Sequence, residues 1–234
     1  MKANLDPFQE AKQKAALEAV KYVKEGFIVG LGSGSTAAFA IKTLGERMEQ
    51  EKLQVMGVPT SYQAFLLAVE CGIPITTLDE HPEIDVTIDG ADQITPELNL
   101  IKGMGAALTR EKIVAAASKL NIIIAEQQKK VKVLGENNQS VPIEVLPFAI
   151  SLAKRKIIAA GGKPILREGK GKLGPVITDN GNVILDTNFG EITKPAELDI
   201  KLKMIPGVVE TGFFVGLTDI AFLGTNSAVE KLRK

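Results

Sequence analysis

Short apolar runs alternate with helical patterns along the first part of this chain. Four such runs occur, at residues 27–31 (FIVGL), 53–58 (LQVMGV), 84–89 (IDVTID) and 121–126 (NIIIAE). A strand that is buried on both faces has this continuous apolar character, and a helix between two strands lets them run parallel. The alternation therefore predicts an α/β fold, with a Rossmann-like open parallel sheet flanked by helices.

Strands predominate after Gly135. Residues 175–186 (PVITDNGNVILD) predict a β-hairpin, because two β-branched runs flank the turn signal Asp-Asn-Gly. Other segments have strand or helix character, namely 140–147, 148–160, 164–168 and 195–204.

The end of the chain returns to the style of the first part. Residues 217–224 predict another apolar strand, and a short C-terminal helix is expected after it. We therefore expect a smaller α+β (ferredoxin-like) domain over residues 133–207. It would be inserted before the last strand of a larger domain, which comprises residues 1–132 and 208–234.

The composition excludes several classes of protein. Lys and Arg equal Asp and Glu in number and are dispersed, so the basic face of a nucleic-acid-binding protein is not expected. A single cysteine rules out an internal disulfide framework, and a single histidine, His81, makes a zinc site improbable. The N-terminus lacks the apolar core of a signal peptide and no run is long enough to span a membrane, so a cytoplasmic protein is expected.

Residues 30–37 (GLGSGSTA) join the first predicted strand to a helix and suit a phosphate group. Glycines let a ligand approach the backbone, a helix N-terminus offers unpaired N–H groups, and Ser33, Ser35 and Thr36 add hydroxyls. A dinucleotide site requires an acid at the end of the second strand, where this chain has Pro-Thr-Ser, and a P-loop requires a lysine. A phosphate monoester is favoured, while a structural turn and a dinucleotide stay open.

Aspartates surround the end of the third apolar run. Asp89 and Asp92 flank Gly90 and Ala91 where the strand is expected to end, so both carboxylates can point into one cleft. They could bind a divalent metal, hydrogen-bond sugar hydroxyls or share acid–base work, or they could only cap a turn. Asp85, earlier in the strand, could simply face a polar edge.

Residues 102–111 (KGMGAALTRE) open another predicted helix, over about residues 107–120. If Glu111 faces the cleft it would lie close to Lys102. An amine that stabilises an enolate oxygen and a carboxylate that moves a carbon-bound proton are what an aldose–ketose isomerase requires. Equally, Glu111 could serve only the helix dipole and Lys102 could be solvated.

Four motifs, GSGSTA, DGAD, KGMGAALTREK and TDNGN, together resemble the ribose-5-phosphate isomerases of type A in their order and spacing. The similarity covers nearly the whole chain, including the α+β insertion. It implies interconversion of D-ribose 5-phosphate and D-ribulose 5-phosphate through an enediol(ate), in the non-oxidative pentose phosphate pathway. It also implies a cytoplasmic homodimer or homotetramer that uses no metal and no organic cofactor.

The resemblance assigns roles to individual residues. Glu111 matches the proton acceptor and Lys102 the substrate-binding lysine, while Asp89 and Asp92 match the aspartates that contact the sugar and assist ring opening and proton movement. Lys129 falls where the family has a further substrate-contacting lysine. The other substrate-binding residues of the pattern are Ser33, Gly34, Ser35, Thr36, Gly90, Ala91, Gly103, Met104 and Gly105.

The sequence departs from the family pattern near the site. Ser33 stands where many members have Thr, and the hydroxyl is retained. Gln93 replaces the Glu commonly found after DGAD, which removes one negative charge. Met104 replaces the middle glycine of a Lys-Gly-Gly-Gly run, and it would be strained if that position requires a positive φ. If only close approach matters, Met104 would narrow the cleft.

Two other functions compete with the isomerase. Effector domains of some transcriptional regulators resemble this fold, but the segment before the first strand has room for one helix and not for a helix-turn-helix. A metal-dependent phosphatase could use Asp85, Asp89 and Asp92. It would release inorganic phosphate and lose activity in EDTA, which the isomerase would not.

Overall fold

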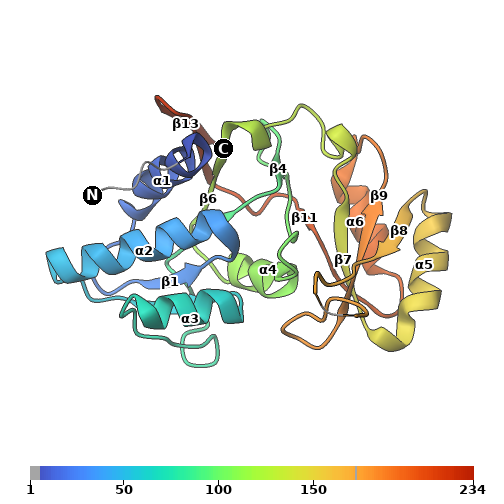
Figure 1. Ribbon diagram of the computed structural model, residues 1–234, viewed down its shortest axis with the longest axis horizontal. Helices are drawn as coiled ribbons and strands as arrows, with labels where there is room; N and C mark the ends of the chain where they lie inside the picture. The colour runs from blue at the N-terminus through green and yellow to red at the C-terminus, as the bar shows by residue number, and fades with distance from the viewer. Residues whose placement is uncertain (1–5, 172) are drawn as a thin grey trace. The chain divides into compact units, whose positions relative to one another are not determined.

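The computed structural model describes residues 6–171 and 173–234, which divide between two units (Figure 1). Unit 1 contains the described residues up to Ala91, the segment Arg110–Lys130 and the segment Leu217–Lys234. Unit 2 contains Asp92–Thr109 and Val131–Gly216. Each unit has its own sheets and its own apolar core.

Unit 1 is built on a six-stranded sheet with the order β13-β12-β6-β3-β1-β2. All neighbours from β12 to β2 pair in parallel, whereas β13 pairs antiparallel with β12. This confirms the predicted open parallel sheet. The strands span Ile28–Leu31 (β1), Met56–Pro59 (β2), Val86–Gly90 (β3), Asn121–Glu126 (β6), Ile220–Gly224 (β12) and Val229–Arg233 (β13).

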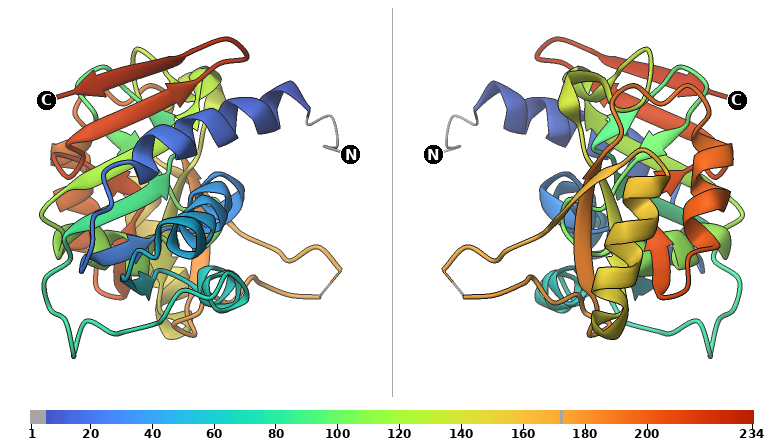
Figure 2. Two further views of the ribbon diagram at one scale, coloured as in Figure 1. Left: turned by 90° about the vertical axis from the view of Figure 1, so that its left-hand side faces the viewer. Right: turned by 90° about the vertical axis from the view of Figure 1, so that its right-hand side faces the viewer.

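Helices α1, α2 and α3 cover one face of this sheet, and Figure 2 shows them on the same side of its strands. Val114 of α4 packs with Ile28 on the opposite face. Gly30 of β1 permits this approach, because a Cβ there would lie 2.7 Å from Val114 Cγ1. The helices span Pro7–Val20 (α1), Gly34–Glu51 (α2), Tyr62–Glu70 (α3) and Leu108–Ala116 (α4), and the 3₁₀ turn η1 spans Gln127–Lys129.

The C-terminal segment is a strand, so the predicted helix is wrong. Residues Val229–Arg233 pair with β12 along its whole length. Their sequence, VEKLR, is rich in good helix formers, which is why local preference favours a helix. Pairing satisfies the backbone groups along the edge of β12, and Lys231 Nζ lies 5.8 Å from the ring centre of Phe222. These tertiary contacts override the local preference.

Unit 2 contains a four-stranded antiparallel sheet with the order β10-β7-β9-β8. The chain order β7-α5-β8-β9-α6-β10 is that of a ferredoxin-like fold, as predicted. These elements span Val141–Val145 (β7), Ile150–Ala159 (α5), Lys163–Leu166 (β8), Val183–Asn188 (β9), Pro195–Lys203 (α6) and Val208–Thr211 (β10), and 3₁₀ turns span Glu136–Asn138 (η2) and Pro147–Ala149 (η3).

The hairpin predicted over residues 175–186 forms only in its second half. β9 begins at Val183 and pairs with β7 and β8, while Ile177 makes a single bridge to Val183. The turn is closed by a hydrogen bond from the Thr178 N–H to the Asn182 carbonyl. The polar side chains of this turn are engaged by a buried carboxylate, described below, and the first half of the predicted hairpin does not extend as a strand.

A three-stranded sheet of unit 2, with the order β11-β5-β4, ties residues 92–109 to the segment after β10. β5 (Leu100–Ile101) pairs antiparallel with both β4 (Gln93–Ile94) and β11 (Phe213–Phe214). The backbone N–H of Lys102 donates to the Gly212 carbonyl over 2.9 Å. Unit 2 contains the expected insertion, residues 133–207, together with Asp92–Thr109, residues 131–132 and residues 208–216, which were expected in the larger domain.

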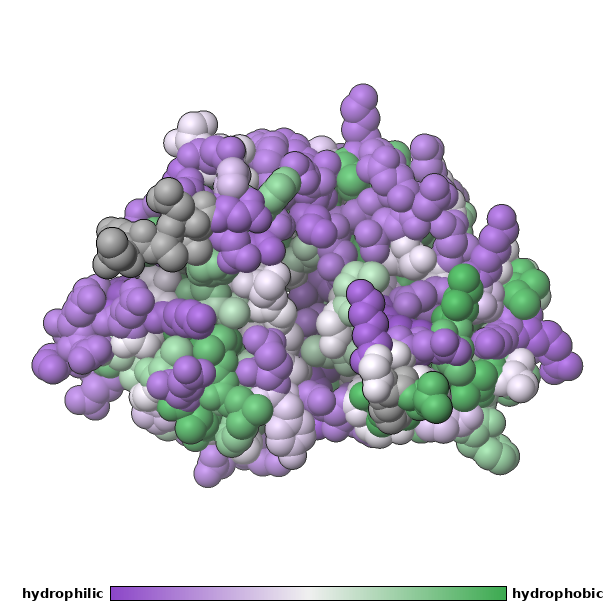
Figure 3. All heavy atoms as spheres, in the orientation of Figure 1, coloured by the Kyte–Doolittle hydropathy of each residue, from purple (hydrophilic) through white to green (hydrophobic). Residues whose placement is uncertain are grey.

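The outer face of α3 carries an apolar stripe. Tyr62, Phe65, Leu66 and Val69 follow helical spacing, and Leu66 is 63% exposed. Figure 3 shows apolar side chains gathered over this helix. Among the described residues, no helix combines the length and apolar character that a membrane crossing requires.

Asp85 lies just before β3 and holds the start of β1. Its carboxylate accepts hydrogen bonds from the Ile28 N–H, over 2.9 Å, and from Lys119 Nζ, over 3.0 Å. Burial alone would raise the pKa of Asp85, but these two hydrogen bonds and the charge of Lys119 outweigh it, so the pKa lies below its ordinary value. Asp85 is therefore a structural carboxylate, as the simpler sequence interpretation has it.

We expect Asp85→Asn to lower the melting temperature at pH 7. Because the folded-state pKa is lowered, the ionised carboxylate stabilises the fold above the unfolded-state pKa of about 4 and loses this effect as the pH falls through the folded-state value. The difference between variant and wild type should therefore shrink in strong acid. Thermal unfolding followed by circular dichroism tests this, with the exposed Asp79→Asn as control; equal melting temperatures of D85N and wild type at pH 7 would contradict it.

Candidate active site

The predicted phosphate loop lies in unit 1 between β1 and α2. Ser33 precedes the first residue of α2, and Gly34 has a φ of +92°, which a residue with a side chain rarely adopts. The Ser33 hydroxyl bonds the hydroxyls of Thr60, over 2.7 Å, and Ser61, over 2.6 Å. The hydroxyl of Ser33 is thus fixed by the residues that follow β2, and the N-terminus of an 18-residue helix opens at the loop.

Asp89 at the end of β3 is joined to this loop. Its Oδ1 accepts hydrogen bonds from the backbone N–H groups of Ser33, over 3.1 Å, and Gly90, over 2.7 Å. A Cβ on Gly32 would lie 2.2 Å from the same oxygen, so only glycine fits there. The structure therefore brings together two of the predicted motifs, GSGSTA and DGAD, with Asp89 only 3% exposed.

Lys12 of α1 contacts the loop and was missed by the sequence analysis. Its Nζ donates to the Ser35 hydroxyl over 3.0 Å and lies 3.2 Å from Glu126 Oε1. Its side chain is only 15% exposed, which places a cation beside the hydroxyls suited to a phosphate. The sequence gives little signal for it, because α1 also contains Lys14 and no motif distinguishes the two lysines.

Glu111 lies in the first turn of α4, in unit 1. It stands three residues before Val114, which packs against β1, and therefore shares the sheet-facing side of the helix. The residue is 4% exposed. Glu111 is thus a buried carboxylate in the first turn of a helix, and its role as proton acceptor stays a prediction.

Lys129 ends the 3₁₀ turn η1 after β6. β6 runs parallel to β3, so Lys129 follows the same edge of the sheet as Asp89. Its neighbour Lys130 is engaged in an ion pair with Glu230, over 2.6 Å. The substrate-contacting role of Lys129 stays a prediction.

In unit 2, Lys102 follows β5 and is 3% exposed. Its Nζ lies 5.3 Å from the ring centre of Phe214, and its backbone is anchored on Gly212 as described above. Residues 103–106 form a tight turn, closed by a hydrogen bond from the Ala106 N–H to the Gly103 carbonyl over 2.9 Å. Lys102 therefore has a packed base and leads directly into a turn.

The turn relieves Met104 of the strain that was considered for it. Positive φ values occur at Gly103 (+101°) and Ala106 (+61°), and Met104 is not among the residues with positive φ. A Cβ on Gly103 would also lie 2.8 Å from Leu108 Cβ. Glycine is thus required at Gly103, and the left-handed strain falls on Ala106 at about 1 kcal/mol. The Met104 side chain is 48% exposed.

Asp92 and Gln93 support the same part of unit 2. Asp92 Oδ2 accepts a hydrogen bond from the Met104 N–H over 3.1 Å. The Gln93 amide donates to the Glu136 carbonyl and accepts from the Gly135 N–H, both over 2.8 Å. A glutamate at position 93 could not donate to that carbonyl, so Gln93 has a structural task of its own here.

Glu144 of β7 explains the TDNGN motif. This carboxylate has 0% exposure and accepts hydrogen bonds from Thr178 and Asn182, both over 2.8 Å, and from Asn180 over 3.2 Å. It also accepts one from Thr109 Oγ1, over 2.5 Å, at the second residue of α4. The motif therefore satisfies a buried charge and joins the turn at residues 178–182 to the start of α4 within unit 2.

Metal-ligand geometry is lacking in the described part of the chain. Residues 6–171 and 173–234 contain no group of three or more His, Cys, Asp or Glu side chains that could hold a metal ion. Asp85 precedes β3 and Asp89 lies near its end, so the two stand at opposite ends of that strand. The three-aspartate site that a phosphatase would require is therefore not formed.

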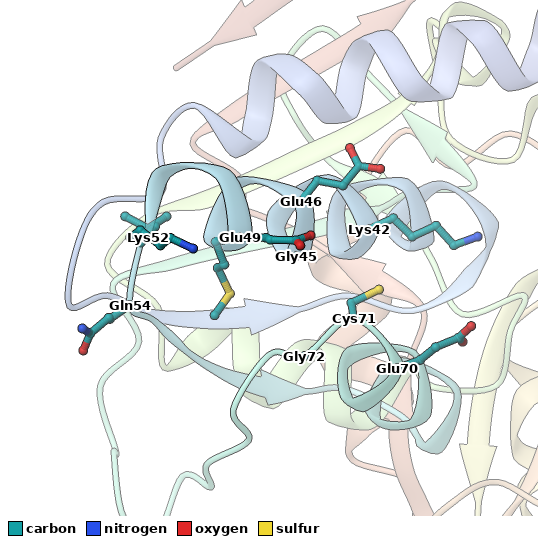
Figure 4. A pocket seen from close by; sticks show the side chains of 11 residues that line it. Lys42, Gly45, Glu46, Glu49, Lys52, Gln54, Glu70, Cys71 and Gly72 are labelled. Carbon is teal, nitrogen blue, oxygen red and sulfur yellow. The ribbon is translucent and has the colours of Figure 1, made fainter. Parts of the chain in front are cut away.

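A hollow of unit 1 lies between the C-terminal parts of α2 and α3 (Figure 4). Its lining includes Lys42, Glu49 and Cys71. Burial, then the nearby charge of Glu70, raises the pKa of the Cys71 thiol. The hollow lies where α2 and α3 end. Ligands of open parallel sheets bind instead beyond the carboxyl ends of the strands. The hollow is separate from the loop at residues 32–36.

The sequence comparisons agree with this geometry. The family described as ribose 5-phosphate isomerase A (phosphoriboisomerase A) matches residues 56–228. The ribose-5-phosphate isomerase A of Methanothermobacter thermautotrophicus is 46% identical over 229 residues, which cover 98% of this chain and 100% of that protein. The one of Methanosarcina acetivorans is 48% identical, over 94% of this chain and 93% of that protein. The chain belongs to the ribose 5-phosphate isomerase A family.

Solved structures agree with the family assignment. A D-ribose-5-phosphate isomerase in complex with phospho-erythronic acid has a TM-score of 0.94 and 46% identity, and the alignment covers 97% of this chain and 99% of that one. The ribose 5-phosphate isomerase A of Methanocaldococcus jannaschii has a TM-score of 0.93 and 44% identity at the same coverage. Ribose 5-phosphate isomerases interconvert ribose 5-phosphate and ribulose 5-phosphate, so the resemblance drawn from the motifs is confirmed.

For this isomerase we expect Glu144→Gln to lower the free energy of unfolding by about 2–3 kcal/mol, since it removes the charge and replaces one acceptor oxygen by an NH2 group that cannot accept from the donors facing it. Thr178→Val removes only one donor and should cost about 1 kcal/mol. Urea unfolding followed by circular dichroism measures both. If the urea concentration at the midpoint of unfolding is the same for E144Q and wild type, the carboxylate is not the centre of this network.

Proposed function

We propose that this chain interconverts D-ribose 5-phosphate and D-ribulose 5-phosphate through an enediolate, with Glu111 as the proton carrier. The observation that carries the proposal is the burial of three ionisable side chains that the family pattern selects. Asp89, Lys102 and Glu111 are 3%, 3% and 4% exposed. Charged side chains are rarely buried to this extent unless they are paired or do chemistry.

The phosphate of the substrate would bind at Ser33, Gly34, Ser35 and Thr36. Support comes from the N-terminus of α2, which offers backbone N–H groups, and from Lys12, whose amine contacts Ser35. This binding is remote from the carbons that react. Its free energy orients the open-chain sugar and makes the proton transfer effectively unimolecular.

Opening of the furanose ring requires a proton to move between the anomeric hydroxyl and the ring oxygen. We assign this step to Asp89, with Asp92 contacting the sugar hydroxyls. Gly90 and Ala91 between them would let the substrate approach the backbone. The hydrogen bonds from the Ser33 and Gly90 N–H groups to Asp89 Oδ1 fix the orientation of this carboxylate beside the phosphate loop.

In the isomerisation itself, Glu111 would take the proton from C2 of the aldose as the C1 carbonyl oxygen gains negative charge. Lys102 would stabilise that oxygen with its ammonium group. Glu111 then returns the proton to C1, while the proton of the C2 hydroxyl passes to the C1 oxygen, so that C2 becomes the ketone and C1 carries a hydroxyl. Gly103, Met104, Gly105 and Lys129 would complete the contacts to the substrate.

Glu111→Gln tests the proton carrier. An amide cannot accept the C2 proton, so we expect kcat to fall by about 10²–10⁴-fold. Inhibition by inorganic phosphate should keep its Ki, because the phosphate loop is unchanged. Glu10→Gln in the first turn of α1 is the matched control and should retain wild-type turnover. A kcat of E111Q near that of wild type would remove Glu111 from the proposed role.

The reaction is measured by a coupled assay for ribulose 5-phosphate, with and without EDTA. Formation of ribulose 5-phosphate in the presence of the chelator, without release of inorganic phosphate, supports the isomerase. Release of phosphate that EDTA abolishes would indicate the phosphatase alternative. Binding of a sugar phosphate without turnover would indicate a sensing module.

We also propose that the protein acts as a homodimer or homotetramer in the cytoplasm. The apolar stripe of α3, Tyr62, Phe65, Leu66 and Val69, supports association, because such a stripe is costly to leave in water. The single cysteine suits a reducing compartment. Light scattering coupled to size-exclusion chromatography measures the molar mass, and a monomer at micromolar concentration would contradict the assembly.

A further inference from the structure

Arg167, which follows β8 in unit 2, donates hydrogen bonds to the turn after Lys102. Its Nε donates to Asp186 Oδ2 over 2.7 Å and its Nη2 to Asp186 Oδ1 over 2.5 Å, which is a bidentate pair. Its Nη1 donates to the backbone carbonyl of Met104 over 2.8 Å and to that of Gly103 over 3.2 Å. The guanidinium group thus connects β9 to the two residues that directly follow Lys102.

The same turn is held from its other side. Asp92 accepts the Met104 N–H, and the Gly103 carbonyl also accepts the Ala106 N–H. Peptide groups on both sides of Met104 are therefore fixed by charged side chains, one by an anion and one by a cation. The side chain of Arg167 is 12% exposed and that of Asp186 is 22% exposed, so both are largely shielded from water.

The chemistry of this contact requires an arginine. A planar guanidinium can use one edge for a carboxylate and the remaining nitrogen for carbonyl oxygens, whereas a lysine ammonium cannot hold both in fixed directions. The two contacts of Nη1 go to backbone oxygens and do not depend on the side chain at position 104, whereas Nη2 also lies 3.9 Å from Met104 Sδ. Met104 in place of the usual glycine therefore keeps the two backbone contacts and adds one through its sulfur.

We propose that Arg167 is a positioning residue of the isomerase, which acts through the turn at residues 103–106 to set the direction of Lys102. The inference rests on the proposed role of Lys102 at the oxygen that gains charge. Misplacement of that amine by a fraction of an ångström weakens its interaction with the transition state more than binding of the ground state. Loss of the Arg167 contacts should therefore lower kcat more than it raises KM.

Arg47 provides a matched control in unit 1. It pairs with Glu51 through Nε, over 2.9 Å, and Nη2, over 2.7 Å, and its Nη1 donates to the carbonyls of Val20 and Val23. This is the same bonding pattern as at Arg167, but the carbonyls belong to the end of α1 and the residues after it. Arg47→Met thus measures what the loss of such a contact costs the fold alone.

The experiment compares Arg167→Met, Arg167→Lys and Arg47→Met in the full chain, at a temperature well below all three melting temperatures. We expect R167M to lose about 10- to 100-fold in kcat with little change in KM, and R47M to keep wild-type kcat while its melting temperature falls. R167K keeps the charge but not the fork and should also lose turnover. Because arginine stays protonated over the working pH range, R167M should lower kcat by the same factor at every pH and leave the shape of the pH profile unchanged.

Several outcomes overturn the inference. If R167M and R167K lose only melting temperature, as R47M does, the contact is structural. A changed shape of the pH profile would assign Arg167 an acid–base role that the proposal denies. Lys102→Met separates the two proposals. Wild-type turnover in K102M, or no isomerase activity in the wild type, refutes the proposed function. Loss of turnover in K102M with full activity in both Arg167 variants refutes only the role of Arg167.

Discussion

The pairing of β1 with β3 is the constraint on which the candidate site of unit 1 depends. Aspartates fix it at both ends: Asp85 accepts the N–H at the start of β1, and Asp89 accepts the N–H just after β1 ends. The residues between them are buried. The two carboxylates stand four residues apart and fix the register of β3 against β1. The loop after β1 is therefore fixed relative to Asp89, because the Ser33 N–H is bonded to that carboxylate. This bond gives a short glycine-rich segment a defined geometry.

Unit 2 solves a similar problem with buried charge. Glu144 gathers the side chains of the TDNGN turn and of Thr109, while Arg167 and Asp92 hold the turn after Lys102. The fully buried Glu144 has several directional partners, which is the condition under which burial of a charge is tolerated. The consequence is that the connection at residues 103–109 is held by directional hydrogen bonds although it contains no strand.

The sequence predicts the parts of this protein that follow from periodicity and from local chemistry. The parallel strands, the ferredoxin-like order of unit 2 and the family could be identified because apolar runs and the motifs around Asp89 and Glu111 are local signals. Lys12 and Arg167 could not, since Ser35 lies 23 residues from Lys12 and Met104 lies 63 residues from Arg167, and nothing local marks either residue. The C-terminal strand failed for the same reason: its pairing with β12 is a tertiary contact that outweighs the helix preference of its residues.

The C-terminal strand also has a consequence for the behaviour of the protein at high concentration. With β13 in place, the outermost backbone of the sheet on that side belongs to a strand that carries Glu230, Lys231 and Arg233. Charged residues on an edge strand discourage another chain from extending the sheet. On the other side, the outer strand β2 is only four residues long, and Gly57 is bridged by Ile75. Both edge strands therefore disfavour aggregation through edge-to-edge pairing. β13 does so by its charged side chains, and β2 by its short length and its bridge to Ile75.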